Sequence, residues 1–167
     1  MLTDRRNIAV FAVLVLLFVL LTALIHSLTG SSPFQPSPYN SYTLQAMAWR
    51  KGQTNLDMDY PHLELAIYKG RYFVSFPPVP GIPVFLLSFI FGLSVPDGLL
   101  VMLYAVIALT VTYRLLLRRG FSALASAFWS FSLCFSSSML PLIFSGAVWY
   151  QAQVMAFMLT VCAIDMM

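Results

Sequence analysis

Charged residues are scarce in this chain of 167 residues. Lys, Arg, Asp and Glu together make up 9% of it, whereas hydrophobic residues make up 60%. Soluble globular domains carry about a quarter charged residues, so this chain lacks the polar groups that would cover a globular surface in water. The composition therefore excludes an ordinary soluble domain and indicates an integral membrane protein.

Cysteine and familiar catalytic motifs are also sparse. Cys134 and Cys162 lie inside apolar runs, where cysteine is typical as a small buried side chain, and they form no Cys-x-x-Cys pair. The chain has no Walker loop, no dinucleotide fingerprint, no His-Glu-x-x-His motif and no repeat of fixed period. Its basic residues flank apolar runs and form no stripe, so we expect no nucleic-acid partner.

Long apolar runs are the main feature that the chain does have. Arg5 and Arg6 precede an unbroken run over 8–28, which is long enough to span a bilayer. The positive-inside rule then places the N-terminus in the cytoplasm. A cleaved signal peptide is the less favoured alternative, because the run is longer than a signal-peptide core. Further runs predict a second span over 99–117, a third over 121–144 and the start of a fourth over 153–167.

The fourth run ends without a basic flank or a loop. This suggests that the sequence is an N-terminal fragment of a longer polytopic protein. Asp165 would lie about 17 Å into a span that begins near Val154, at a rise of about 1.5 Å per residue. A carboxyl group at that depth in a membrane is costly, so Asp165 is a candidate functional residue.

A long loop over 29–97 joins the first two spans, and we expect it outside the cytoplasm. Ser37-Pro38 is typical of a helix start and Gly52 of a helix stop, so a helix over 38–51 is predicted to lie on the membrane surface. The segment 66–76 is rich in aromatic and β-branched residues and suggests a small hairpin or an extended crossing. Gly70 would supply the positive φ that a tight turn needs.

The segment 79–95 decides the topology. Prolines interrupt its start, and the apolar run that follows is short for a span, so we expect a re-entrant or interfacial segment. If it dips in and returns, Arg114, Arg118 and Arg119 at the end of the second span face the cytoplasm. If it crosses fully, they face outward, against the positive-inside rule. We therefore expect an all-α polytopic bundle in the plasma (inner) membrane, with a long extracytoplasmic first loop that carries short surface helices.

The densest group of chemically capable side chains follows the predicted surface helix. The first interpretation is a site for a divalent cation such as Mg²⁺, Mn²⁺ or Ca²⁺, although the Asp-x-Asp spacing is a weak signal. Its plausible ligands are Asp57, Asp59, His62 and Glu64. The second interpretation is acid–base chemistry, with Asp59 first and Asp57 second as the base. The third is a solvated loop whose carboxylates cap turns and pair with Lys69 and Arg71, each pair contributing about 0–1 kcal/mol.

The acid–base interpretation also needs groups that bind the substrate. Cationic side chains in the predicted hairpin would steady a leaving phosphate, and an outer turn over 146–153 would line the far side. The residues assigned to substrate binding are Lys69, Arg71, Tyr72, Trp149 and Gln151.

Three stretches carry a resemblance to a known family: Tyr42-x3-Ala46-x5-Gly52, then Gly70-Arg71-Tyr72-Phe73-Val74-Ser75-Phe76-Pro77-Pro78, then Phe91-Gly92. One span, a long outer loop with short helices and a Pro-Pro motif that opens an apolar segment resemble the integral-membrane glycosyltransferases of the C superfamily. These include the protein O-mannosyltransferase and aminoarabinose-transferase types. The chain looks most like uncharacterised bacterial polytopic proteins with the second of these motifs.

The resemblance implies transfer of a sugar from a polyprenyl-phosphate donor to an acceptor on the outer face, with an aspartate of the first loop as base. This sequence departs from the family pattern at two places: the usual Asp-Glu pair falls on Pro38-Tyr39, and the lysine that often precedes the Pro-Pro motif is Phe76. Other loop residues would have to take over both roles. The alternative from another class is a non-catalytic multi-pass protein for lipid binding, transport or assembly.

Overall fold

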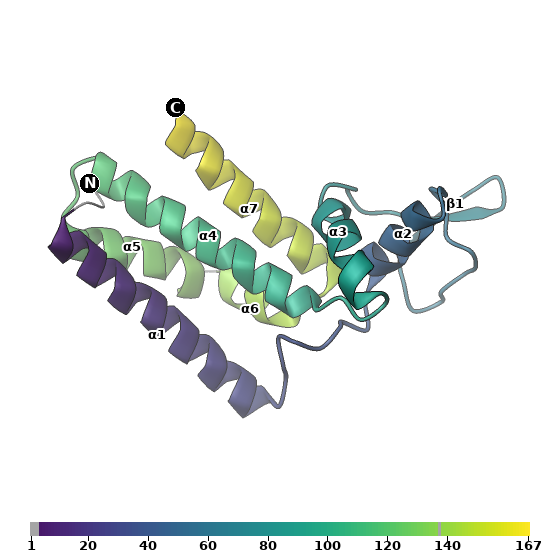
Figure 1. Cartoon of the computed structure of the whole chain (residues 1–167), viewed down its shortest axis with the longest axis horizontal. Coiled ribbons are helices and arrows are strands. Elements are labelled where there is room, and N and C mark those ends of the chain that lie inside the picture. The colour runs from purple at the N-terminus through teal and green to yellow at the C-terminus, as the bar shows by residue number, and fades with distance from the viewer. Residues whose placement is uncertain (1–3, 137) are drawn as a thin grey trace.

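The computed structural model describes residues 4–136 and 138–167, and these residues are mostly helical (Figure 1). They form seven helices and one two-stranded sheet. The prediction of a helical protein is confirmed, but the predicted all-α class leaves out the small β-sheet. The elements are α1 Arg5–Thr29, α2 Ser41–Arg50, β1 Leu65–Tyr68, β2 Arg71–Val74, α3 Gly81–Phe91, α4 Asp97–Arg118, α5 Ala123–Phe135, α6 Met139–Ser145 and α7 Val148–Met166.

Three helices, α1, α4 and α7, are long and apolar enough to span a membrane. Helices α5 and α6 would together make a fourth span, but they are bent by 61° relative to each other. The apolar segment predicted as one span over 121–144 therefore consists of two helices with a bend between them. Pro141 gives a physical reason, because it has no backbone N–H and its ring clashes with the preceding helical turn. Helix α3 has 11 residues and is about 16 Å long, about half of a bilayer core.

Helix α4 is central in the bundle: it packs against α5 and α7, and α1 packs against α5. Helices α1 and α4 run antiparallel. The Tyr113 hydroxyl, late in α4, donates to the carbonyl of Asn7, early in α1, at 2.9 Å. At the other end, the Asp97 carboxylate accepts a hydrogen bond from the Ser37 N–H, beyond α1, at 3.1 Å. The start of α1 and the α4–α5 turn therefore share one end of the bundle.

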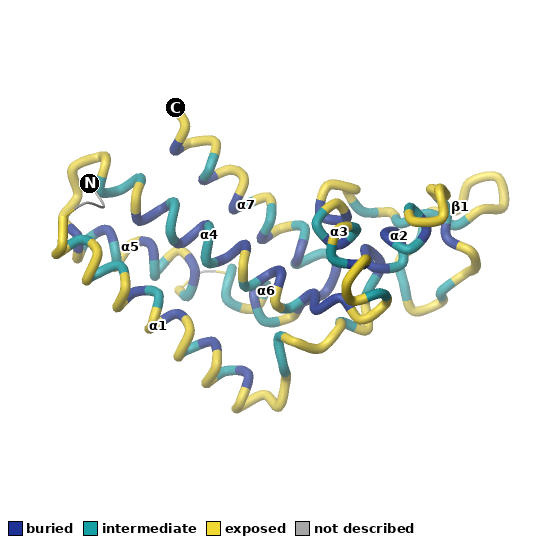
Figure 2. The backbone as a smooth tube through the Cα atoms, viewed as in Figure 1, coloured by how far each residue is buried: buried dark blue, intermediate teal, exposed yellow. Residues whose placement is uncertain are grey.

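The opposite end carries α2, α3 and the hairpin together, so α3 does not run along the bundle (Figure 1). We call this the loop end, and the end with the α4–α5 turn the arginine end. In α1, only Leu14, Phe18, Thr22 and His26 form a buried stripe. Figure 2 shows most of the remaining helix exposed. Such a broad exposed apolar surface is typical of a helix that faces lipid.

Helix α2 begins at Ser41, where the sequence had predicted Pro38, and it is more buried than a surface helix would be. Tyr42 and Ala46 are 1% and 0% exposed because α2 packs against α3. Arg50 joins the two helices: its guanidinium donates to the Ser88 carbonyl at 2.7 Å and lies 4.7 Å from the centre of the Phe89 ring. The α2–α3 pair is thus a packed unit at the loop end.

The predicted hairpin is confirmed, with β1 and β2 paired from Leu65↔Val74 to Tyr68↔Arg71. Lys69 and Gly70 have φ of 49° and 70°, and positive φ at both central positions is what a type I′ turn requires.

The outer turn predicted over 146–153 is shorter than expected. Gly146, with φ of 61°, ends α6, and α7 begins two residues later at Val148. The fourth apolar helix therefore begins at Val148, before the predicted start at 153. Trp149 and Gln151 lie in its first turn.

Candidate functional site

The predicted catalytic aspartates lie at the loop end, and the structure treats them differently. Asp57 forms an ion pair with Lys51, and the two side chains are 52% and 54% exposed. A pocket of about 180 Å³ opens beside this pair, and we call it the loop pocket. Its lining consists of Leu44, Met47, Ala48, Lys51, Leu56, Asp57, Tyr60 and Leu93.

Local pairing brings Asp57 to this position. The N–H of the preceding residue, Leu56, donates to the Tyr72 carbonyl at 2.8 Å, and the Leu56 side chain is buried. The segment that carries Asp57 therefore runs beside β2, while the end of α2 supplies Lys51. The loop pocket thus places a carboxylate and an ammonium group beside an apolar surface.

Asp59 and His62 are exposed, and the structure does not gather them around Asp57. The rings of Tyr60 and His62 are 6.3 Å apart. Among the described residues, no three His, Cys, Asp or Glu side chains form a group that could hold a metal ion. The four predicted ligands, Glu64 included, are therefore not arranged as a metal site in this structure.

Glu64 instead contacts α7. The indole Nε1–H of Trp149 donates to Glu64 Oε2 at 3.0 Å, and the Trp149 ring lies 5.6 Å from the rings of both Tyr39 and Phe76. Trp149 therefore joins the hairpin region to the start of α7. The structure therefore brings together Glu64, a residue of the predicted acidic loop, and Trp149, which was predicted to line the far side of the site.

The predicted phosphate-binding residues lie along the hairpin. Lys69 occupies its turn, with the ammonium group 5.2 Å from the centre of the Tyr68 ring. Arg71 is exposed and Tyr72 is half-buried in β2. The carboxylate of Asp57 pairs with Lys51, whereas the solvated-loop interpretation of the sequence paired the carboxylates with Lys69 and Arg71. The reason is that α2 ends next to the loop, which a linear sequence does not reveal.

A group of buried polar side chains comes from α2, α4 and α7, and sequence analysis missed most of it. Tyr42 from α2, Tyr104 from α4 and Gln151 from α7 are at most 4% exposed. The Tyr42 OH and Gln151 Nε2 atoms have no hydrogen-bond partner among the described residues. Tyr104 lies near both Gln151 and Asp97. The signal that could have revealed the group is a tyrosine inside a predicted span.

The electrostatics of this buried group limit its chemistry. Burial raises the pKa of Tyr42 to about 12, and the neighbouring Tyr104 adds to the rise. Tyr42 is therefore neutral at physiological pH, where its hydroxyl can donate and accept hydrogen bonds but does not act as an anionic nucleophile. The predicted substrate-binding residue Gln151 belongs to this buried group and does not line the loop pocket.

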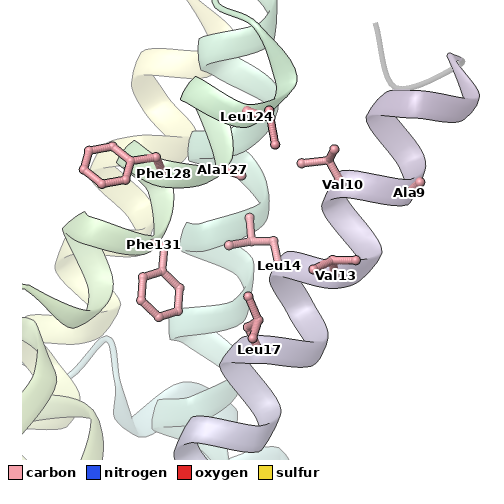
Figure 3. Close-up of a pocket in the computed structure, with 9 residues that line it drawn as sticks. All are labelled: Ala9, Val10, Val13, Leu14, Leu17, Leu124, Ala127, Phe128 and Phe131. Atoms are coloured by element: carbon pink, nitrogen blue, oxygen red, sulfur yellow. The ribbon is translucent and has the colours of Figure 1, made fainter.

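A wider groove of about 460 Å³ lies between α1 and α5 (Figure 3). No charged or hydroxyl-bearing side chain lines it, so it offers no acid–base chemistry, and in a bilayer it would face lipid chains. Its lining residues are Ala9, Val10, Val13, Leu14, Leu17, Leu124, Ala127, Phe128 and Phe131.

Comparison with models of known protein families, with curated proteins and with solved structures finds no match to this chain. The choice of a function therefore depends on the chemistry at the loop end, together with the family resemblance of the sequence. At that end, the loop pocket combines groups that can accept a proton and bind an anion.

Proposed function

We propose that this chain is a multi-pass membrane protein that transfers a sugar from a polyprenyl-phosphate donor to an acceptor at the loop end. The loop pocket is the observation that carries the proposal, because Asp57 and Lys51 share its lining with apolar side chains. A lipid-linked sugar donor needs an apolar surface for the lipid, a cation for the phosphate and a base for the acceptor.

The surface beside the loop pocket supports a position at the membrane interface. Helix α3 buries Val84 and Ser88 but leaves Leu86, Phe89 and Ile90 between 60% and 76% exposed. Apolar helix faces enter the boundary between headgroups and acyl chains, and adjacent cations attract lipid phosphates. The proposed location is the plasma (inner) membrane, with the N-terminus in the cytoplasm and the loop end outside.

In the proposed reaction, the acceptor hydroxyl oxygen attacks the anomeric carbon of the donor sugar. The bond from that carbon to the phosphate oxygen breaks, and polyprenyl phosphate leaves. Asp57 takes the hydroxyl proton, while Lys51 turns from Asp57 to the leaving phosphate. Asp57 replaces Asp59 as the preferred base because it lines the pocket, and Lys51 takes the role first assigned to Lys69 and Arg71.

Asp57→Asn tests this assignment, with Asp59→Asn as a matched control. Loss of a general base lowers rates by about 10²–10⁴-fold, so we expect consumption of a polyprenyl-phosphate-linked hexose to fall by at least about 100-fold in Asp57→Asn. We expect Asp59→Asn to stay within about threefold, because Asp59 does not line the pocket. The measurement is loss of labelled hexose from the polyprenyl-phosphate donor in membranes, with membrane insertion checked for each variant.

Other outcomes contradict the proposal in defined ways. Loss of activity in Asp59→Asn alone would assign the base to Asp59. If the unsubstituted protein consumes no donor, while it and both variants bind a polyprenyl phosphate and Lys51→Gln loses that binding, the chain is a non-catalytic lipid-binding protein. That result would favour the transport or assembly alternative.

A further inference from the structure

The arginine end of the molecule carries a charged group that the proposed function does not use. The Asp165 side chain is only 2% exposed, and Arg114 and Arg118 pair with its two carboxylate oxygens. Arg118 Nη1 donates to Oδ1 at 3.0 Å and to the Asp165 backbone carbonyl at 2.7 Å. Both arginine side chains remain 49% exposed, so each has N–H groups left to bind another partner.

The position of Asp165 differs from the sequence prediction. Because α7 begins at Val148, Asp165 lies about 26 Å along the helix, near the full thickness of a bilayer core of about 30 Å. It therefore lies near the opposite side of a bilayer core from Val148, next to the end of α4. A carboxylate there need not be an intramembrane catalytic group.

A pocket of about 250 Å³ opens next to this ion-pair group, and we call it the arginine pocket. Its lining consists of Leu115, Arg118, Arg119, Ile164, Asp165 and Met167. Arg119 makes no ion pair with any described residue. Two arginines thus pair with the carboxylate and a third lines the same pocket, so the four side chains together have a formal charge of +2.

This arrangement is suited to a phosphate group. Asp165 holds Arg114 and Arg118 in place, and guanidinium groups bind phosphate oxygens with two parallel hydrogen bonds. The pocket also includes the apolar side chains of Leu115 and Ile164, and it lies at the arginine end of α4, a candidate membrane span. A ligand that fits both features carries a phosphate next to a hydrocarbon chain.

We propose that the arginine pocket binds the phosphate of an anionic phospholipid at the membrane surface on the N-terminal side. Arg118 and Arg119 contact the headgroup, and Asp165 is a positioning residue that orients Arg114 and Arg118. The binding site is independent of the loop pocket, so neither proposal requires the other. The lipid binds α4 and α7 together and stabilises the bundle.

The test compares the melting temperature of the purified protein in neutral detergent with added phosphatidylglycerol, phosphatidylcholine or inorganic phosphate. We expect phosphatidylglycerol to raise it by at least about 3 °C and the other two to have little effect. Arg119→Gln should lose most of this increase but keep the melting temperature in phosphatidylcholine, because Arg119 has no internal ion pair. Arg71→Gln, an exposed arginine at the loop end, should keep the increase.

Asp165→Asn separates positioning from direct binding. It should lower the melting temperature in every lipid, because a buried ion pair has lost one partner, and it should also lose part of the phosphatidylglycerol increase, because Arg118 is no longer oriented toward the headgroup while Arg119 is unchanged. Retention of the full increase would show that Asp165 has a structural role only. The proposal is overturned if Arg119→Gln keeps the full increase, or if Arg71→Gln loses as much of it. An equal increase with inorganic phosphate would show an anion site that does not recognise lipid.

Discussion

Among the described residues, Lys69 is the only one other than glycine with a positive φ. A side chain in this left-handed region costs about 1–2 kcal/mol, so the turn would be more stable with a residue that tolerates the region, such as asparagine. The lysine also places a cation at the tip of the hairpin, away from the Lys51–Asp57 pair. Its charge and its backbone conformation can therefore be tested separately.

Lys69→Asn should stabilise the hairpin, because Asn-Gly is the preferred pair for a type I′ turn. We expect slower amide hydrogen exchange over 65–74 and unchanged consumption of the polyprenyl-phosphate-linked hexose, since Lys51 contacts the phosphate in our proposal. Lys69→Gln is the control, as it removes the charge without the turn preference of asparagine. Loss of donor consumption in both variants would instead assign the phosphate contact to Lys69.

Sequence analysis located the polar residues of the site but not their partners. It singled out Asp57 without identifying Lys51, because the pairing depends on the path of the chain after α2. It assigned Gln151 to a substrate surface, yet the amide is 1% exposed between helices. Hydropathy shows that a residue is polar, whereas its burial depends on contacts between elements far apart in the sequence.

At the scale of elements, the long apolar runs were informative because about 20 apolar residues are needed to cross a bilayer. The runs over 8–28 and 99–117 lie within α1 and α4, respectively. The first and last residues of the shorter elements were harder to predict. The start of α7 resembled an outer turn because its first residues are aromatic and polar. Helix α2 was predicted to lie on the membrane surface, although it is buried against α3.

The contact between α2 and α3 depends on Gly81. A Cβ at this position would lie 2.8 Å from Gln45 Oε1 and 3.0 Å from Trp49 Cη2. The Gln45 amide can turn away, but the Trp49 ring is packed against Phe85. We therefore expect Gly81→Ala to destabilise the protein by about 1 kcal/mol, the low end of the range for overpacked sites. The measurement is thermal unfolding, together with proteolysis of the loop end.

Ile82→Ala is the matched control for this prediction, because Ile82 is the next residue of α3 and is 53% exposed. It should change the unfolding free energy much less than Gly81→Ala. Equal effects of the two substitutions would contradict the close packing of α2 on α3.

At the scale of the whole molecule, the distribution of charge agrees with the antiparallel arrangement of the helices. Arg5, Arg6, Arg118 and Arg119 all lie near the arginine end, and the segment 30–96 lies at the opposite end (Figure 1). If the spans cross a membrane, this arrangement satisfies the positive-inside rule without a full crossing by α3. Whether the loop pocket faces outward can then be measured directly.

Single cysteines at exposed positions test this topology, in a background with Cys134→Ala and Cys162→Ala. Thr54→Cys and Ser94→Cys probe the loop end on either side of α3, and Phe121→Cys probes the α4–α5 turn. Gly120 in the same turn is unsuitable for a cysteine because its φ is 88°. A membrane-impermeant maleimide on intact cells should label the first two, and the third only after permeabilisation. Labelling of Phe121→Cys alone would place the loop pocket in the cytoplasm. Different labelling of Thr54→Cys and Ser94→Cys would show that α3 crosses the membrane, which separates Asp57 from the rest of the loop end and contradicts the transferase proposal.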